Sequence, residues 1–292
     1  MKVHLYMRRY MQPGRPGPDQ NQIPNAIEGF RRHGIEPVVL PAGQSAPCDL
    51  AVVWGVRFPT DVASGRRYLV FERAYVGDRY YWTSIGFDGL NGYADFRNSN
   101  SPSDRWEKYF AGVMQPWRGH EGKHVLIAGQ KPGDQSLRGL NTFEWCIRVA
   151  TEIESAGRAV KVRRHPKAQN AMYPFRDVMT YGERMRVREE RLLAKRIFSD
   201  PTCDIAQDLQ NASWLVTYNS NSAVDAVLAG VPAVTCDPGS MAWPVTGHDP
   251  TSPPPMPDRT QWAYDLAYTQ WSPDEVRNGD AWDHLRGGME VA

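Results

Sequence analysis

The sequence contains few cysteines and no cysteine cluster. Only four occur among the 292 residues, at positions 48, 146, 203 and 236, and no two of them form a C-x-x-C pair. This wide spacing excludes a clustered cysteine zinc site and argues against a disulfide framework in a chain of this size. We therefore expect reduced thiols, most of them with structural roles.

Long hydrophobic runs are also missing. The longest ones, such as residues 125–128 (VLIA), are far shorter than the ~20 residues that a membrane helix requires. The first residues (MKVHLYMRRYMQ) contain no apolar signal core. The sequence therefore predicts a soluble, cytoplasmic protein without a membrane span.

Neither sign of charge is in large excess. Lys and Arg together number 34 and Asp and Glu 33, so the net charge of +1 gives no general signature of a nucleic-acid-binding protein. Among the basic residues, however, 27 are Arg and 7 are Lys. The guanidinium fork suits phosphate groups, so the excess of Arg indicates either a phosphate-bearing partner or simply a GC-rich coding sequence.

Several catalytic motifs are absent. The chain has no G-x-S-x-G, no P-loop and no G-x-G-x-x-G, which removes the simplest hydrolase, NTPase and Rossmann dehydrogenase hypotheses. It also has no Asp-x-Asp, with which many sugar transferases hold Mg²⁺ or Mn²⁺. Residues 120–124 (HEGKH) match the H-E-x-x-H zinc motif, but Gly122 weakens a helix and a strand begins at once. We expect a turn at a domain boundary there and no metal site.

What is present is an alternation of apolar runs and helical patterns over a length that suits two domains. The first series predicts strands at 2–7, 37–40, 50–54 and 68–72, with a helix at 21–33. The second series predicts strands at 124–128, 159–163, 214–217 and 233–235, and helices at 141–156, 182–196, 205–211 and 222–229. This order predicts an α/β protein with parallel sheets covered by helices on both faces.

Changes in composition suggest the domain limits. We expect an N-terminal α/β domain at 1–120 and a second α/β domain at 121–248. Residues 249–292, a proline-rich connector and a helical tail, are expected to cross back to the first domain. Residues 73–104 are rich in Gly, Asn and aromatic side chains and predict a long functional loop.

Polar residues follow three predicted strands of the second domain, where α/β proteins bind ligands. The loop after 124–128 contains Gln130, Asp134 and Ser136, and the turn after 159–163 contains His165-Pro166. The helix after 214–217 starts with Ser220, Asn221 and Ser222, and Asp225 follows one turn later. Hydroxyl, imidazole and backbone N–H donors suit a phosphate. Each group also has a structural alternative, namely a helix cap, a structural histidine or a solvent-facing aspartate.

This ordered set resembles the donor domain of GT-B glycosyltransferases, particularly the capsule-synthesis transferases that move Kdo from CMP-Kdo. The family pattern is a G-Q-x-x-x-D-x-S loop, then His-Pro, then a serine-rich helix start followed by A-L-x-x-G-x-P-V, and an aromatic turn. The corresponding residues here are Gln130, Asp134 and Ser136, then His165-Pro166, then Ser220 to Val234, and Ala242-Trp243. The resemblance spans residues 125–249 of the 292.

The resemblance implies a GT-B-like fold of two Rossmann-like α/β domains facing across a cleft. It implies a metal-independent enzyme whose nucleotide-sugar donor, linked to UDP, GDP or CMP, is a co-substrate, with no further cofactor. The donor phosphate is then held by His165, Ser220, Asn221 and Ser222, in the same site as Gln130, Asp134 and Ser136. Fixed donors of this kind offset the charge that develops on a leaving nucleotide, and Asp225 can accept from ribose hydroxyls.

The catalytic base is expected in the first domain. Kdo transferases have an E-D-G-F-like segment after a strand, and residues 71–75 (FERAY) occupy that position without the Asp-Gly. Glu72 is the first candidate for the base, followed by Asp78 and Asp88. The aromatic side chains that follow Glu72, at positions 75, 80, 81 and 82, suggest flat surfaces on which a substrate stacks. The structural alternative pairs Glu72 with Arg73 or Arg79.

Two acceptors remain open. The aromatic loop that continues through Asp78, Asp88, Asn91 and Asp95, and the tail LAYTQW, resemble phage and prophage glycosyltransferase-like proteins. With the Arg excess and a basic cluster at 184–196, this narrowly favours a hydroxymethylated pyrimidine in phage DNA, although acidic residues at 183, 189 and 190 are typical of a solvated helix. A capsule or surface polysaccharide is the alternative. A GT-B-shaped epimerase or a non-catalytic nucleotide-sugar binder is the second alternative, and no oligomeric state is predicted.

Overall fold

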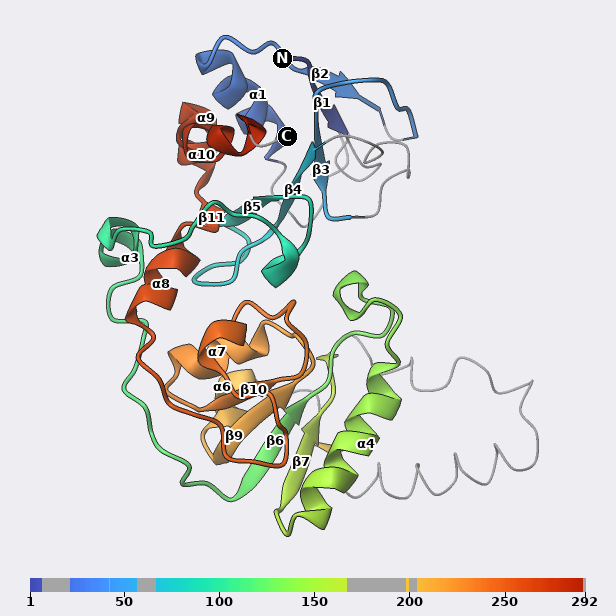
Figure 1. Cartoon of the computed structure of the whole chain (residues 1–292), viewed down its shortest axis with the longest axis vertical. Helices are drawn as coiled ribbons and strands as arrows, with labels where there is room; N and C mark the ends of the chain where they lie inside the picture. The colour runs from blue at the N-terminus through green and yellow to red at the C-terminus, as the bar shows by residue number, and fades with distance from the viewer. Residues whose placement is uncertain (7–21, 42, 57–66, 167–197, 200–203, 291–292) are drawn as a thin grey trace, which may run out of the picture. The chain divides into compact units, whose positions relative to one another are not determined.

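The computed structural model describes residues 1–6, 22–41, 43–56, 67–166, 198–199 and 204–290. The chain divides into two compact units (Figure 1). Unit 1 combines Met1–Ala111 with Arg259–Ala292, and unit 2 is Gly112–Asp258. The limits thus fall at 111 and 258, whereas the sequence suggested 120 and 248. The helix expected at 182–196 lies outside the described residues.

Unit 1 is built on a six-stranded mixed sheet. In sheet order its strands are β11 (Gln270–Trp271), β5 (Thr83–Phe87), β4 (Arg67–Arg73), β3 (Leu50–Trp54), β1 (Val3–Tyr6) and β2 (Val38–Leu40). The four strands β1 to β4 pair in parallel, as the sequence predicts. β5 pairs antiparallel with both β4 and β11, so the expectation of an all-parallel sheet is wrong for this edge.

β5 lies inside residues 73–104, for which the sequence predicted a loop. The segment Thr83–Phe87 contains only two large apolar residues, so it shows neither an apolar run nor a clear alternation. All five residues are nevertheless buried, because the strand is paired on both sides. The same region also holds a short 3₁₀ helix, η2 (Asn91–Tyr93), and the helix α3 (Asp104–Tyr109).

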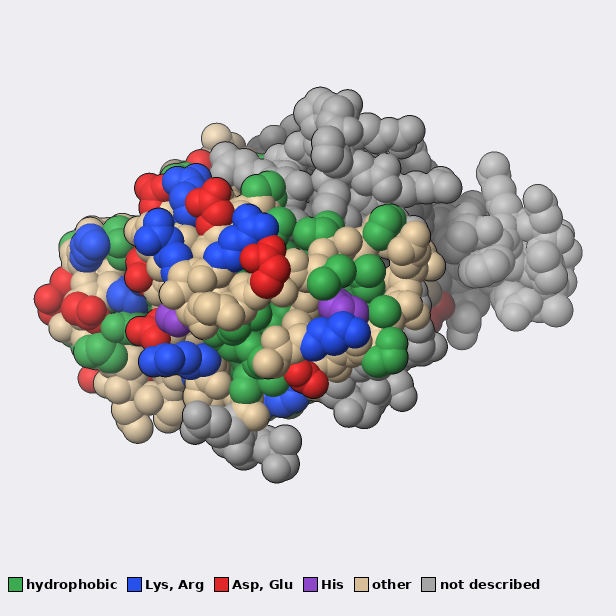
Figure 2. Space-filling model, turned by 90° about the horizontal axis from the view of Figure 1, so that it is seen from above, with side chains coloured by type: hydrophobic (Ala, Val, Ile, Leu, Met, Phe, Trp, Pro, Cys, Tyr) green, Lys and Arg blue, Asp and Glu red, His purple; other side chains and the backbone are tan. Residues whose placement is uncertain are grey.

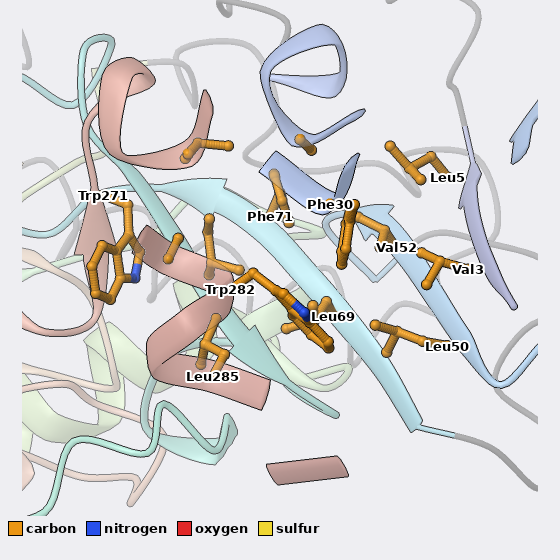
Figure 3. Packing of buried hydrophobic residues seen from close by; sticks show 14 of the residues in the cluster. Val3, Leu5, Phe30, Leu50, Val52, Leu69, Phe71, Trp271, Trp282 and Leu285 are labelled. Carbon is orange, nitrogen blue, oxygen red and sulfur yellow. The ribbon is translucent and has the colours of Figure 1, made fainter. Parts of the chain in front are cut away.

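The main core of unit 1 lies on one face of this sheet. The helices α1 (Ile23–Arg32), α9 (Pro273–Asn278) and α10 (Asp280–Leu285) cover that face, followed by η6 (Arg286–Glu290). Figure 3 shows Leu5, Val52 and Leu69 of the strands facing Phe30, Trp282 and Leu285 of the helices. The Phe30 and Trp282 rings lie 5.0 Å apart. A smaller cluster around Ala51, Val53 and Val70 lies on the opposite face, where the described partners from outside the sheet are the loop residues Cys48, Val56 and Leu90.

Polar contacts fasten the C-terminal segment to the rest of unit 1. The Gln270 side chain accepts from the N–H groups of Tyr75 and Val76 at 3.0 Å and donates to the Val76 carbonyl at 2.8 Å. Arg105 of α3 forms a buried ion pair with Glu275, and its guanidinium lies 4.1 Å from the centre of the Trp271 ring. The helix α8 (Thr260–Ala267) packs against α3. These contacts bring residues about 170 positions apart in the sequence into one unit.

Unit 2 is a three-layer α/β unit with a parallel sheet. In sheet order its strands are β10 (Ala233–Thr235), β9 (Ala212–Thr217), β6 (His124–Ala128), β7 (Val160–Arg163) and β8 (Phe198–Ser199). All neighbouring pairs are parallel, which confirms the prediction for this half of the chain. The helix α4 (Thr142–Ser155) covers one face, and α6 (Ile205–Leu209) and α7 (Ser222–Leu228) cover the other (Figure 1). Two short 3₁₀ helices, η3 (Gln135–Leu137) and η5 (Trp243–Val245), follow β6 and β10.

Candidate active site

A pair of amides joins the loops that follow β6 and β9. The Gln130 side chain donates through Nε2 to Asn219 Oδ1 at 2.8 Å, and its Oε1 accepts from the backbone N–H of Asn219 at 3.0 Å. Both side chains are buried. Since β6 and β9 are neighbours in the sheet, this reciprocal pair fixes two adjacent strand ends relative to each other.

The same network extends to β10. Asn219 Nδ2 donates to Asp237 Oδ1 and to the Ser136 carbonyl, in each case at 2.8 Å. Asp237 follows β10, is buried, and also accepts from the backbone N–H of Gly239 at 2.9 Å. The loops after three neighbouring strands are therefore held as one body at the carboxyl edge of the sheet.

Sequence reasoning missed Asn219 and Asp237. The only signal in the sequence was their position, since Asn219 comes two residues after β9 and Asp237 two residues after β10. In the row YNSNS, Asn219 was not distinguished from the residues expected to cap the next helix. Their side chains connect residues 89 and 18 positions apart, which no local pattern reveals.

The predicted residues of the β6 loop form one cluster. Asp134 Oδ1 accepts from the Ser136 N–H at 3.0 Å and from its Oγ at 2.8 Å, so Asp134 caps η3. Gln130 Nε2 also lies 3.3 Å from Ser136 Oγ. Asp134 is exposed and Ser136 is half-buried, whereas Gln130 is buried. Asp134 and Ser136 are therefore accessible to a ligand, while the buried Gln130 side chain stabilises the loop.

The serine-rich segment begins α7 as predicted. Ser220 Oγ accepts from the Ser222 N–H at 3.2 Å, and the Ser220 carbonyl accepts from Ala223 at 3.1 Å. Because Ser220 Oγ acts as an acceptor, its O–H bond points elsewhere and is a donor for a further group. The Ser222 hydroxyl is buried and makes no hydrogen bond within the described part of the chain. Asn221 and Asp225 are half-buried on the first turn.

His165 lies at the same edge of the sheet, immediately beyond β7. The buried carboxylate of Asp208 on α6 anchors this strand, since it accepts from Lys161 Nζ at 2.7 Å and Arg163 Nη1 at 3.0 Å. His165 is half-buried. One strand, β6, separates β7 from β9, so the ends that carry His165 and Ser220 are about 10 Å apart.

The three carboxylates proposed for unit 1 do not form one group. Glu72 lies near the carboxyl end of β4, opposite Ser84 of β5. Asp88 lies at the other end of this hairpin, about 13 Å away by strand geometry. There it accepts from Arg67 Nε at 2.7 Å and from the Tyr68 N–H at 2.9 Å. Asp88 therefore acts as an ion-pair partner remote from Glu72.

Glu72 and Asp78 lie toward the same end of the hairpin. Glu72 is half-buried, and its Oε1 accepts from the Arg73 N–H at 3.0 Å. Burial raises the pKa of the neighbouring Tyr75 hydroxyl, a hydrogen bond with Ser84 opposes this shift, and the Glu72 carboxylate adds to it. Asp78 is exposed and closes a turn by accepting from the Tyr80 N–H at 2.8 Å.

The aromatic residues after Glu72 divide into two kinds. Tyr75 and Trp82 are buried in unit 1, whereas Tyr80 and Tyr81 are exposed. The flat surface that the sequence suggested is therefore formed by the two exposed tyrosines alone.

Two further expectations concern metals and membranes. The segment HEGKH is irregular backbone that leads into β6, with His120 Nε2 2.8 Å from the Pro254 carbonyl, and it forms no helix. Among the residues that the structure describes, no group of three or more His, Cys, Asp or Glu side chains is arranged to hold a metal ion. Within the same residues no helix has the length and apolar character needed to cross a membrane.

Comparison with known proteins finds matches only among solved structures. No protein-family model matches the chain, and no curated protein matches it. The KpsC β-Kdo 2,4-transferase of Thermosulfurimonas dismutans matches with a TM-score of 0.54 and 12% identity, over 91% of this chain and 90% of that one. The β-Kdo 2,7-transferase of KpsC from the same organism has a TM-score of 0.49 and 12% identity, over 99% and 100% of the two chains. The UDP-GlcNAc 2-epimerase of Methanocaldococcus jannaschii has a TM-score of 0.26 and 9% identity, over 100% and 99%.

The match to the 2,4-transferase establishes the fold. The chain has the GT-B-type architecture of two Rossmann-like α/β units, which confirms the fold class expected from the sequence. The likeness to phage and prophage proteins is not among these findings and stays a prediction.

Proposed function

We propose that the protein is a glycosyltransferase that binds a nucleotide-sugar donor on unit 2 and transfers the sugar to an acceptor hydroxyl. The observation that carries this proposal is the hydrogen-bonded joining of the loops after β6, β9 and β10 at the carboxyl edge of a parallel sheet. Open α/β sheets bind their ligands at this edge. The fold shared with the KpsC 2,4-transferase supports the same conclusion.

In this proposal the donor phosphate binds between His165 and the segment Ser220 to Ser222. An imidazole and two hydroxyls there offset the negative charge that develops on the leaving nucleotide. Asp225 accepts from ribose hydroxyls, and the loop of Asp134 and Ser136, which follows β6 between β7 and β9, borders the site. Independence from divalent metal stays a prediction from the absence of Asp-x-Asp in the sequence.

His165→Ala is expected to lower kcat/KM by roughly 10²-fold, as removal of one preorganised transition-state donor does. The measurement is donor hydrolysis across UDP-, GDP- and CMP-sugars, which also identifies the nucleotide. His120→Ala is the matched control, because this imidazole belongs to the same unit but precedes β6, at the opposite edge of the sheet. Unchanged kinetics in the His165 variant would remove His165 from the site. A chain that neither binds nor hydrolyses any of these donors would overturn the proposed function itself.

Glu72 is proposed as the base that takes the proton of the acceptor hydroxyl. Glu72→Gln keeps the size of the side chain and its hydrogen bonding but removes its basicity. We expect kcat to fall by about 10²-fold, while donor affinity and melting temperature stay near wild type. The alternative is a structural carboxylate. In that case the variant melts at a lower temperature, its folded fraction turns over normally, and the base must be sought at Asp78.

A saccharide of capsule or surface-polysaccharide type is the acceptor that the fold similarity favours. The basic cluster on which the DNA hypothesis depended, residues 184–196, lies outside the described residues. On the face in Figure 2, basic and acidic side chains are interspersed and no broad basic patch is visible. A DNA acceptor therefore stays a prediction from the sequence. An epimerase or a non-catalytic binder would bind nucleotide yet transfer sugar to neither class of acceptor.

A further inference from the structure

A tight turn after β4 is fixed by its own backbone and by buried aromatic rings. The Asp78 carbonyl accepts from the N–H groups of Tyr81 and Trp82 at 3.1 and 3.0 Å. The buried Trp82 ring packs on Tyr109 and Phe110, with ring centres 5.0 and 5.2 Å apart. The preceding Gly77 has φ +73, and a Cβ there would lie 3.3 Å from the Phe110 ring, so the entry to the turn requires glycine.

This rigid turn presents two tyrosines to solvent. Tyr80 is 52% exposed and Tyr81 is 40% exposed. Tyr81 stands edge-on against Trp82, with ring centres 5.3 Å apart, and the Arg73 guanidinium carbon lies 4.7 Å from the centre of the Tyr80 ring. We call Arg73, Tyr80 and Tyr81 the tyrosine ledge. Exposed aromatic side chains that are ordered before any ligand arrives are typical of binding surfaces, since less entropy is lost on binding.

The tyrosine ledge lies at the carboxyl ends of the parallel strands of unit 1, the edge at which α/β sheets bind ligands. Arg73 is the last residue of β4, whose neighbour β3 runs parallel to it, and the carboxyl ends of parallel strands share one edge. Glu72, the proposed base, directly precedes Arg73. The ledge and the base therefore belong to the same end of the same strand.

The charges around the ledge distinguish between classes of ligand. The segment 72–82 contains two basic residues, Arg73 and Arg79, and two acidic ones, Glu72 and Asp78. A nucleic-acid backbone requires several cations that are not balanced by nearby carboxylates. Balanced charge beside exposed aromatic faces suits instead a pyranose ring, whose C–H face packs on an aromatic ring while its polar groups bond a fixed donor.

We infer that the tyrosine ledge is the acceptor subsite and that its ligand is a saccharide. A sugar ring stacks on Tyr80 and Tyr81, and a carboxylate or a pair of hydroxyls on the sugar accepts from the Arg73 guanidinium. This inference rests on the proposed function and assigns three residues of unit 1 to the binding of its saccharide acceptor.

The test measures saccharide binding to the full chain by calorimetry, with no donor present. The probes are a panel of neutral and carboxylate-bearing oligosaccharides and, separately, a duplex that contains hydroxymethylcytosine. Tyr80→Ala and Tyr81→Ala are each expected to weaken saccharide binding about tenfold, the size of one aromatic contact. Tyr93→Ala is the matched control, since Tyr93 is also exposed (37%) but belongs to η2 and not to the turn. If a sugar carboxylate is the partner of Arg73, Arg73→Gln should weaken the binding of carboxylate-bearing probes more than that of neutral ones. If sugar hydroxyls are the partner, it should weaken the binding of both kinds of probe equally.

The outcomes separate the ledge from the proposed function. The inference is supported if Tyr80→Ala and Tyr81→Ala weaken saccharide binding and Tyr93→Ala does not. This conclusion does not depend on the result of the donor screen. Binding of the duplex alone, binding of no saccharide in the panel, or equal weakening by all three tyrosine variants would overturn it. Because no donor is present, failure here leaves the donor site on unit 2 to be judged by the His165 experiment.

Discussion

Asn219→Ala should lower the free energy of unfolding of unit 2 by about 3–5 kcal/mol, because three polar groups in or beside the buried network each lose a hydrogen bond at once, one of them a carboxylate. Gln130 Nε2 loses its acceptor on Asn219, and the Asp237 carboxylate and the Ser136 carbonyl each lose a donor. The bond from the backbone N–H of residue 219 to Gln130 Oε1 is kept, and the side chains of Gln130 and Asp237 remain buried. Removal of one partner from a buried network costs more than the hydrogen bonds themselves contribute, since each stranded group has been taken out of water.

Thr217→Val provides the matched control. Thr217 is fully buried at the end of β9, two residues before Asn219, and its hydroxyl donates one hydrogen bond, to the Ala128 carbonyl at 3.0 Å. Loss of this hydrogen bond is expected to lower the free energy of unfolding of unit 2 by about 1 kcal/mol, near the usual net contribution of one hydrogen bond. Hydrogen exchange read separately on peptides from β6, β9 and β10 reports the stability of unit 2. If Asn219→Ala cost no more than Thr217→Val, the three loops would not be held by this network.

Glu275→Ala should destabilise unit 1 by a similar amount, about 3–5 kcal/mol, because it strands a buried guanidinium. Arg105 is almost completely buried, donates to the carbonyls of Ala267 and Gln270, and bonds both oxygens of Glu275. The loss of stability of unit 1 is measured by hydrogen exchange in increasing urea, read on peptides from β5 and β11. Replacement of both partners, Arg105→Met with Glu275→Leu, should be much less harmful than Glu275→Ala alone, since no charge is then stranded.

The same pair predicts a pH dependence of unit 1. Burial alone would raise the pKa of Glu275, but hydrogen bonds from Arg105 and Ser272 and the Arg105 charge outweigh it, so the pKa lies below its ordinary value of 4.5. A carboxyl whose pKa is lowered by folding contributes stability above its unfolded pKa and loses that contribution as the pH falls through the folded pKa. The stability of unit 1 should therefore decline below about pH 4.5, and Glu275→Gln should remove this part of the decline. An identical acid profile in the variant would show that other carboxyls control it.

The sequence predicts four of the five strands described in unit 2, because most of them are apolar runs between helical patterns, as 124–128 (HVLIA) shows. The fifth, β8 (Phe198–Ser199), has two residues and shows no pattern. The prediction also fails at β5 and β11, where burial comes from pairing and not from composition. The segment Thr83–Phe87 has a serine and a glycine on either side of its central isoleucine, and Gln270–Trp271 is too short to show a period. The antiparallel edge of unit 1 depends on contacts between residues 83–84 and 270–271, which no local window contains.

The candidate site shows the same limit. The sequence proposes Ser220, Ser222 and His165 as site residues because polar residues directly after a strand lie at the edge where parallel sheets bind ligands. Gln130 was found for the same reason, yet its side chain is directed at Asn219 and not at solvent. Several polar residues follow each strand, and the sequence does not show which of them contacts a ligand and which stabilises the loop. That depends on hydrogen-bond partners far away along the chain.

The order of the units along the chain determines when each can fold. Unit 2 is continuous, so all of its strands are present once residue 258 has been synthesised. Unit 1 is interrupted by unit 2, and two of the three helices that cover the core of its sheet, α9 and α10, belong to the last 34 residues, Arg259–Ala292. A nascent chain therefore carries β1, β3, β4 and β5 with α1 as the one helix available for their apolar face, and the part that α9 and α10 cover stays open until synthesis is almost complete. The edge of β5 is equally unpaired until β11 arrives, and such a strand edge is the surface on which two unfinished chains would associate.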